Sequence, residues 1–341
     1  MNKTTKEKQH IVPQFVLRNF SVKDKLYTYD KHTEKIYGSS VKDSGCEKSF
    51  YDFQIKVDDK ILQGTIEEKL CEIECNASRV IKKILKQDDV KNITDEEKEH
   101  MDYFLAAQMM RTKNVKENFK SMPEQLRNAI RQRMPKLAND VGLDEKFPDF
   151  EDDALNLHFD VLIANSTERL KAYFKGLEWI LVKTDESKPF LIGDSPVIVY
   201  NELYSDEKES FYFSKYAIGY KGSCVFFPIS PTRALWLVSP ALIEMYVKSN
   251  KELLNLFLVG VKVAKDVIKM GTQVQDFINI EEGFTKTKKL TFSSQYVDKY
   301  NYFEIINAER KIFSKFPDFN QVEELIKQNE HYKHGIRVVC N

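Results

Sequence analysis

The sequence predicts an α+β protein. We expect a small N-terminal antiparallel β-meander packed on long helices, followed by a second, mostly β sheet with flanking helices. Three patterns support this class. Short Tyr- and Phe-rich runs separated by turn residues open the chain. Segments with apolar residues every three or four positions follow them. Later runs of β-branched and aromatic residues, bounded by Gly, Pro and Asp, are typical of buried strands.

The chain has 341 residues, of which 42% are hydrophobic and 30% charged, as in an ordered globular protein. It exceeds the roughly 250–300 residues at which single cores stop growing. We therefore predict two regions: 1–140, with the β-meander, helices and a polar cluster, and 150–341, with the second sheet, its helices and a C-terminal tail. The acidic segment 137–153, with Gly142 and Pro148, is the expected boundary.

Charge and cysteine content exclude several classes. Lys plus Arg and Asp plus Glu both total 52, so no global field attracts nucleic acid, and any basic site must be local. The five cysteines are scattered and contain no CxxC pair, which argues against a disulfide framework or a structural zinc site. No stretch has the length of a membrane span, and no signal-peptide pattern opens the chain. We expect a cytoplasmic protein.

The individual elements follow in chain order. The runs KLYTYD, EKIYG and SFYDF predict the three strands of the meander. TIEEKLCEIECNASRVIKKIL predicts a helix with Thr65 as its N-cap, and ITDEEKEHMDYFLAAQMMRTKN predicts a second helix with a capping box formed by Thr94 and Glu97. Residues 111–136 hold eight basic and two acidic residues in helical sequence that ends near Pro135.

The second half changes from helical to strand-like spacing. A helix is predicted over residues 154–176. Five strands are then predicted in EWILVKT, PFLIG, PVIVYN, GSCVFFPI and RALWLVS. A helix over residues 250–269 and a short one in DFNQVEELIKQN complete the prediction.

Polar residues on the predicted apolar faces are the candidates for function. Gln108 continues the stripe of Met101, Phe104 and Leu105, and Arg111 follows one turn later, so the pair can present an amide and a guanidinium to a carboxylate or phosphate. The alternative is a helix end at which both meet solvent. On the preceding helix Glu67 and Glu74 lie seven residues apart on one side. They can bind a cation or divide acid and base roles, or they can be ordinary solvated carboxylates.

Three further residues stand at the ends of predicted elements. His10 can be a base, a ligand or a capped histidine at the start of the first ordered segment, and Arg18 closes that apolar segment. Asp194 follows a buried strand, where catalytic carboxylates are often placed, although Asp-Ser-Pro is also good turn chemistry. The other histidines form no HxH or HExxH pattern, and we expect His331 and His334 on the surface.

Several short motifs occur in one characteristic order: HIVPQFVLRNF, LYTYDKHTEK, EKSFYDF, IEEKLCEIE, FLAAQMMRTKN, FLIGDSPV and FPISPTRAL. Together they resemble the DUF4238 family over about residues 9–270. The resemblance implies an intracellular, usually bacterial protein with one shared architecture, and it assigns no catalytic role. The matching positions are His10, Pro13, Leu17, Arg18, Phe20, Asp30, Glu47, Tyr51, Glu74, Gln108, Arg111, Asp194 and Pro196.

The first functional hypothesis is a metal-dependent nuclease or phosphodiesterase of a bacterial defence or mobile-element system. His10, Glu74 and Asp194 would be catalytic. Arg18, Gln108 and Arg111 would bind the substrate phosphate. Mg²⁺ or Mn²⁺ would be held by Glu47, Glu74 and Asp194, since both ions prefer oxygen ligands. DNA or RNA would be the partner, contacted by the basic stretch 111–136.

The alternative is a non-catalytic binding or regulatory protein, with a protein as its partner, in which the same polar residues form a buried structural network. Arg18 and Arg111 would then pair with Glu47, Glu74 or Asp30. Breaking such a buried pair singly costs about 3–5 kcal/mol. A toxin-like transferase ranks last, because no segment supplies phosphate-cradling glycines.

Overall fold

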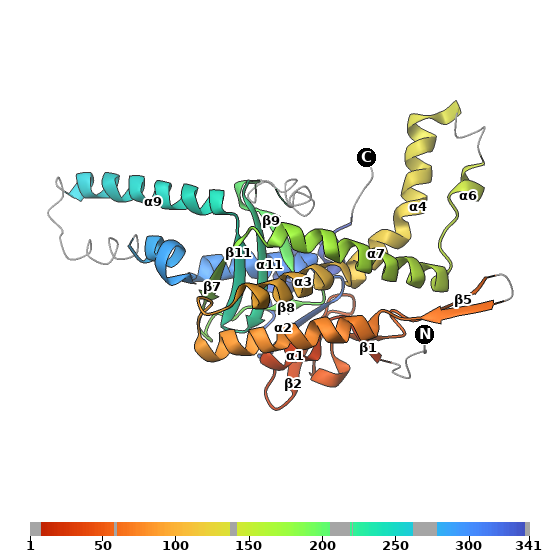
Figure 1. Ribbon diagram of the computed structural model, residues 1–341, viewed down its shortest axis with the longest axis horizontal. Helices are drawn as coiled ribbons and strands as arrows, with labels where there is room; N and C mark the ends of the chain where they lie inside the picture. The colour runs from red at the N-terminus through yellow and green to blue at the C-terminus, as the bar shows by residue number, and fades with distance from the viewer. Residues whose placement is uncertain are drawn as a thin grey trace.

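The computed structural model describes residues 8–57, 60–136, 142–204, 219, 221–261 and 278–337 (Figure 1). The fold is α+β, which confirms the predicted class: small antiparallel sheets lie near the N-terminus, and a larger mixed sheet with flanking helices comes later. Within these residues, no helix combines the length and apolarity needed to cross a bilayer.

The N-terminal region consists of short elements. They are β1 (Lys8–His10), α1 (Gln14–Asn19), β2 (Lys25–Asp30), β3 (Lys35–Ser40), η1 (Val41–Asp43), β4 (Cys46–Lys48), β5 (Phe53–Val57) and β6 (Lys60–Gly64). The predicted pairing of β2 with β3 is confirmed. The prediction of a third meander strand was wrong, because SFYDF forms mostly a turn. The nearby strand β4 pairs with β1, and β5 forms a separate hairpin with β6.

The helices are α2 (Glu67–Gln87), α3 (Asp95–Met110), α4 (Lys113–Arg133), α6 (Leu143–Lys146), α7 (Asp152–Phe174), α9 (Pro240–Val261), α11 (Ser294–Asn307) and α12 (Asn320–Gln328), with short turns η2 (Glu202–Tyr204), η3 (Gly283–Thr287) and η4 (Glu330–Lys333). The capping box of Thr94 and Glu97 is present at the start of α3. Ile66, not Thr65, is the N-cap of α2, although the Thr65 hydroxyl accepts the Glu67 N–H. α9 begins ten residues before the predicted helix, whose part beyond Val261 lies outside the described residues.

A five-stranded sheet forms the centre of the fold, in the order β12 (Lys289–Thr291), β7 (Glu178–Lys183), β11 (Arg233–Val238), β10 (Ser223–Ser230), β9 (Ile198–Asn201). Successive side chains of a strand point to opposite faces. Val225 and Phe227 therefore pack with α1, α2 and α3, whereas Phe226 packs with Tyr300 of α11 on the other side. Helices thus cover both faces, and the central residues of β7, β10 and β11 are apolar and buried.

A four-stranded sheet joins distant parts of the chain, in the order β3-β2-β13-β8. Its inner strand β13 (Lys311–Ser314) is antiparallel to both β2 and β8 (Ile192–Gly193). The division of the chain near residues 140–150 stays a prediction, but this sheet contains strands from both sides of it. Of the expected linker 137–153, the part from 142 is described and contains α6.

Helix α3 buries a carboxylate, and this gives a prediction. Asp102 is 3% exposed, and burial raises its pKa to about 7. The unfolded chain loses this proton near pH 4. Between about pH 4 and the folded-state pKa of about 7, the unfolded chain releases this proton while the native protein keeps it, so the free energy of unfolding falls as the pH rises. The fall ends once the pH has passed this pKa.

We expect Asp102→Asn, which carries no charge at any pH, to gain thermal stability relative to wild type between about pH 5 and pH 8. Melting temperatures of both proteins across this range measure the difference. Glu96→Gln, in the exposed first turn of the same helix, is the control and should run parallel to wild type. Parallel curves for Asp102→Asn as well would contradict the prediction.

Candidate functional site

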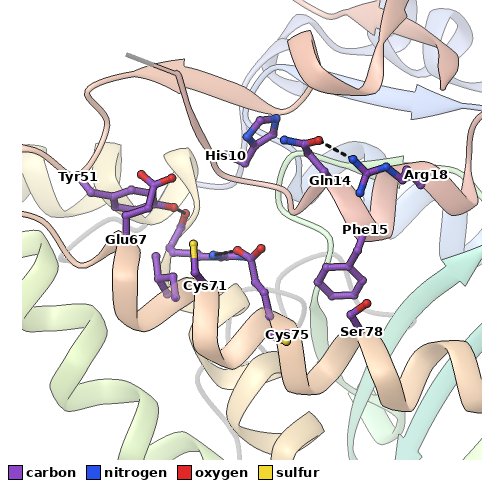
Figure 2. A pocket seen from close by; sticks show the side chains of 12 residues that line it. His10, Gln14, Phe15, Arg18, Tyr51, Glu67, Cys71, Cys75 and Ser78 are labelled. Carbon is purple, nitrogen blue, oxygen red and sulfur yellow. Dashed lines mark hydrogen bonds and ion pairs between the residues drawn. The ribbon is translucent and has the colours of Figure 1, made fainter. Parts of the chain in front are cut away.

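A pocket of about 400 Å³ lies between α1 and α2, below the end of β1 (Figure 2). Its twelve lining residues come from four segments that are distant in sequence. They are His10, Gln14, Phe15, Arg18, Tyr51, Glu67, Leu70, Cys71, Glu74, Cys75, Ser78 and Arg111. Five residues predicted from the sequence as candidates therefore line this pocket: His10, Arg18, Glu67, Glu74 and Arg111.

Arg111 is the centre of the polar network. Its side chain is 2% exposed. Nη1 donates to Glu74 Oε1 at 2.7 Å, and Nε donates to Gln108 Oε1 at 2.8 Å. Gln108 in turn donates from Nε2 to the carbonyl oxygen of Ile11 at 3.0 Å. The remaining nitrogen, Nη2, is buried and has no hydrogen-bond partner among the described residues.

The position of Arg111 explains why the charge is buried here. Arg111 is the C-cap of α3, so its backbone N–H still donates to the Ala107 carbonyl oxygen. Its side chain extends toward α2, where it meets Glu74. The Glu74 carboxylate raises the guanidinium pKa against the opposing effect of burial, so the side chain stays charged. Gln108 does not line the pocket. It orients Arg111 from behind and ties α3 to the segment after β1.

His10 is the last residue of β1, opposite Cys46 of β4. Burial lowers its pKa below the usual value, against the opposing effects of Glu74 and of the backbone at Val41 and Lys42. Its Nε2 is buried and lacks a hydrogen-bond partner within the described residues. The ring is therefore neutral at neutral pH and available as a base.

Arg18 lies at the rim of the pocket, on α1. Its Nη2 donates to Gln14 Oε1 at 2.8 Å, and its Nε is 3.5 Å from Asp24 Oδ1. The side chain is 54% exposed, so this ion pair is weak and the guanidinium can turn to a ligand. Figure 2 shows Arg18 and His10 on the same side of the pocket, opposite α2.

Helix α2 forms the opposite wall. Its pocket-lining residues recur every three or four positions, which places them on one helix face. They are Glu67, Leu70, Cys71, Glu74, Cys75 and Ser78. Sequence reasoning selected the two glutamates and missed both cysteines and Ser78. Their helical spacing relative to Glu74 is the signal that would have identified them.

Two predicted residues lie elsewhere. Glu47 forms an ion pair with Lys113, with Oε1 to Nζ at 2.6 Å. The Asp194 carboxylate accepts the backbone N–H groups of Glu309, Arg310 and Lys311 at 2.6–2.9 Å. Neither lines the pocket.

The structure therefore does not gather Glu47, Glu74 and Asp194 into one site. Among the described residues, the group of three metal-capable side chains with converging ligand atoms is a different one, His32, Glu309 and His334. The physical reason is that each of the three predicted carboxylates already has a basic or N–H partner. Burial raises the pKa of Asp194, while its three N–H donors and Lys31 oppose that rise.

The pocket combines positive and negative groups in a partly enclosed space. His10 and Arg18 lie opposite helix α2, which contributes the carboxylates of Glu67 and Glu74, and Arg111 is paired with Glu74. Such an arrangement can bind a small anion through guanidinium N–H donors. It can also move a proton through His10.

No curated protein and no solved structure matches the chain significantly. A family model described as protein of unknown function (DUF4238) matches residues 8–318. The match extends well past residue 270, where the motifs recognised in the sequence end, and includes α11 and β13. Because it covers nearly the whole chain, including every residue that lines the pocket, the protein belongs to the DUF4238 family.

Proposed function

We propose that the pocket binds a phosphate ester and that the protein is a phosphodiesterase. The observation that carries the proposal is the buried Arg111, whose Nη2 has no hydrogen-bond partner among the described residues. A buried guanidinium nitrogen without an acceptor is costly. A phosphate oxygen at the pocket wall would satisfy it with a charge-assisted hydrogen bond.

The other residues take roles that fit their surroundings. Arg18, at the rim, supplies a second guanidinium to the same phosphate. His10, neutral because burial lowers its pKa, accepts the proton of the attacking water or hydroxyl and gives it to the leaving oxygen as the P–O bond breaks. Glu74 acts as a positioning residue, because it fixes the plane of the Arg111 guanidinium.

A divalent ion, Mg²⁺ or Mn²⁺, remains part of the proposal at the α2 wall. Glu67 and Glu74 both contribute carboxylates to the pocket. An ion at Glu74 would compete with Arg111 for Oε1. The assay therefore includes each ion and an arm with EDTA, since loss of turnover in EDTA would show that turnover requires a divalent ion.

The substrate class is a small phosphodiester or nucleotide. The pocket volume of about 400 Å³ is in the range of small-molecule sites. Several basic residues of helix α4, which was expected to contact DNA or RNA, form ion pairs within the protein. Lys113 is paired with Glu47, and Arg127 and Arg131 both pair with Asp144. A nucleic acid would thus enter by a strand end, with little contact along α4.

Turnover of a chromogenic phosphodiester and of linear and cyclic dinucleotides tests the proposal. We expect His10→Gln to lower kcat by about 10²–10⁴-fold, the usual contribution of a general base. His100→Gln, a half-exposed histidine on α3, is the matched control and should retain wild-type turnover. Absence of turnover in the wild type with either ion would refute the phosphodiesterase. Equal rates for both variants would refute the role of His10 as the base.

A second function, ligand binding without chemistry, is favoured by the network around Arg111. Glu74 and Gln108 accept hydrogen bonds from the guanidinium, and Gln108 donates to the Ile11 carbonyl, so the network links α2, α3 and the segment after β1. In that case calorimetry would show nucleotide or phosphate binding that Arg18→Gln weakens, while no substrate is turned over.

A further inference from the structure

A second cluster of chemistry-bearing side chains lies away from the pocket. His32 follows β2, Glu309 lies between α11 and β13, and His334 follows η4. One ligand atom from each lies within 4.8 Å of the other two. The two imidazole ring centroids are 4.6 Å apart, and His334 Nδ1 is 3.9 Å from Glu309 Oε1.

We propose that His32, Glu309 and His334 bind a zinc-class divalent transition metal. Two imidazoles and one carboxylate are a common ligand set for Zn²⁺, which leaves the fourth position to water. Tetrahedral coordination at 2.0–2.1 Å requires ligand atoms about 3.3 Å apart. Both histidines are exposed, so small side-chain rotations close the remaining distance without moving the backbone.

Glu309 is the fixed member of the set. Its side chain is 3% exposed. Arg337 donates to both carboxylate oxygens at 2.6 Å, and the N–H of Gly335 donates to Oε2 at 3.2 Å. Hydrogen bonds of this kind orient metal-ligating carboxylates. The carboxylate is therefore held in place before any ion arrives.

The surrounding cations disfavour a metal that is bound mainly by charge. Arg337 already neutralises Glu309, and the buried Lys31 also acts on it electrostatically. An ion bound mainly by charge, such as Mg²⁺ or Ca²⁺, gains little from such a site. Zn²⁺ gains most of its binding energy from the nitrogen ligands, which these cations do not occupy.

Zinc titration of the untagged full-length chain tests the proposal by calorimetry and by thermal melting. We expect one equivalent of Zn²⁺ to bind and to raise the melting temperature, whereas Mg²⁺ does neither. His32→Ala and His334→Ala should each weaken zinc binding by about tenfold or more and abolish the melting shift. Both residues are exposed, so neither variant threatens folding.

His331→Ala is the matched control, an exposed histidine three residues from His334 that is outside the cluster, and it should bind zinc as wild type does. Failure of the wild type to bind zinc would overturn the proposal. Unchanged binding in His32→Ala and His334→Ala would also overturn it, because the metal would then be elsewhere, for example at Cys71 and Cys75. The outcome does not depend on the phosphodiesterase, since neither histidine lines the pocket.

Discussion

Replacing Asp194 by alanine is expected to lower the free energy of unfolding by about 3–5 kcal/mol. The carboxylate is buried and accepts three consecutive backbone N–H groups, those of Glu309, Arg310 and Lys311. Alanine leaves all three donors at the start of β13 without an acceptor. It also removes the carboxylate that stabilises the charge of the buried Lys31.

Urea denaturation at neutral pH measures this loss. Asp194→Asn is the informative companion: it keeps the volume but replaces one acceptor oxygen by an NH₂ group that faces a backbone donor, so its loss should be intermediate. A change of less than about 1 kcal/mol for Asp194→Ala would contradict this structural role.

Glu74→Gln is expected to lower the free energy of unfolding by about 3 kcal/mol, at the low end of the cost of breaking a buried ion pair. Arg111 remains buried and charged, and glutamine offers only a neutral oxygen in place of the carboxylate at 2.7 Å. The 23% exposure of Glu74 places the value at the low end, because water can partly compensate.

Glu72→Gln, on the exposed side of the same helix, is the control and should change stability little. Unchanged or raised stability in Glu74→Gln would mean that the carboxylate is held at a cost to folding, as catalytic groups often are. Denaturation and the phosphodiester assay on the same variant therefore separate the structural role of Glu74 from a catalytic one.

Local signals predicted much of the fold. The capping box at Thr94, the apolar spacing of α2 and the turn-bounded strands β7, β10 and β11 all depend on residues close in sequence. The error at the meander has the opposite cause. β2 takes β13 as its second neighbour, and nothing in the local sequence of either strand specifies a partner so distant.

The same distinction holds for the candidate site. Gln108 and Arg111 were identified because polar residues interrupted an apolar stripe, and they do form one buried network. Asp194 was selected because it follows a buried strand, yet its partners are N–H groups more than a hundred residues later. The burial of a polar residue is predictable from spacing, whereas what satisfies it depends on tertiary neighbours.

The position of β13 in the four-stranded sheet also determines when that sheet can form during synthesis. β2 leaves the ribosome early, but the strand that completes its ladder is encoded near the other end of the chain. Nascent chains fold progressively from the N-terminus, so the β2–β3 hairpin keeps one exposed edge until β13 has been synthesised. The four-stranded sheet can therefore close only after β13 has left the ribosome.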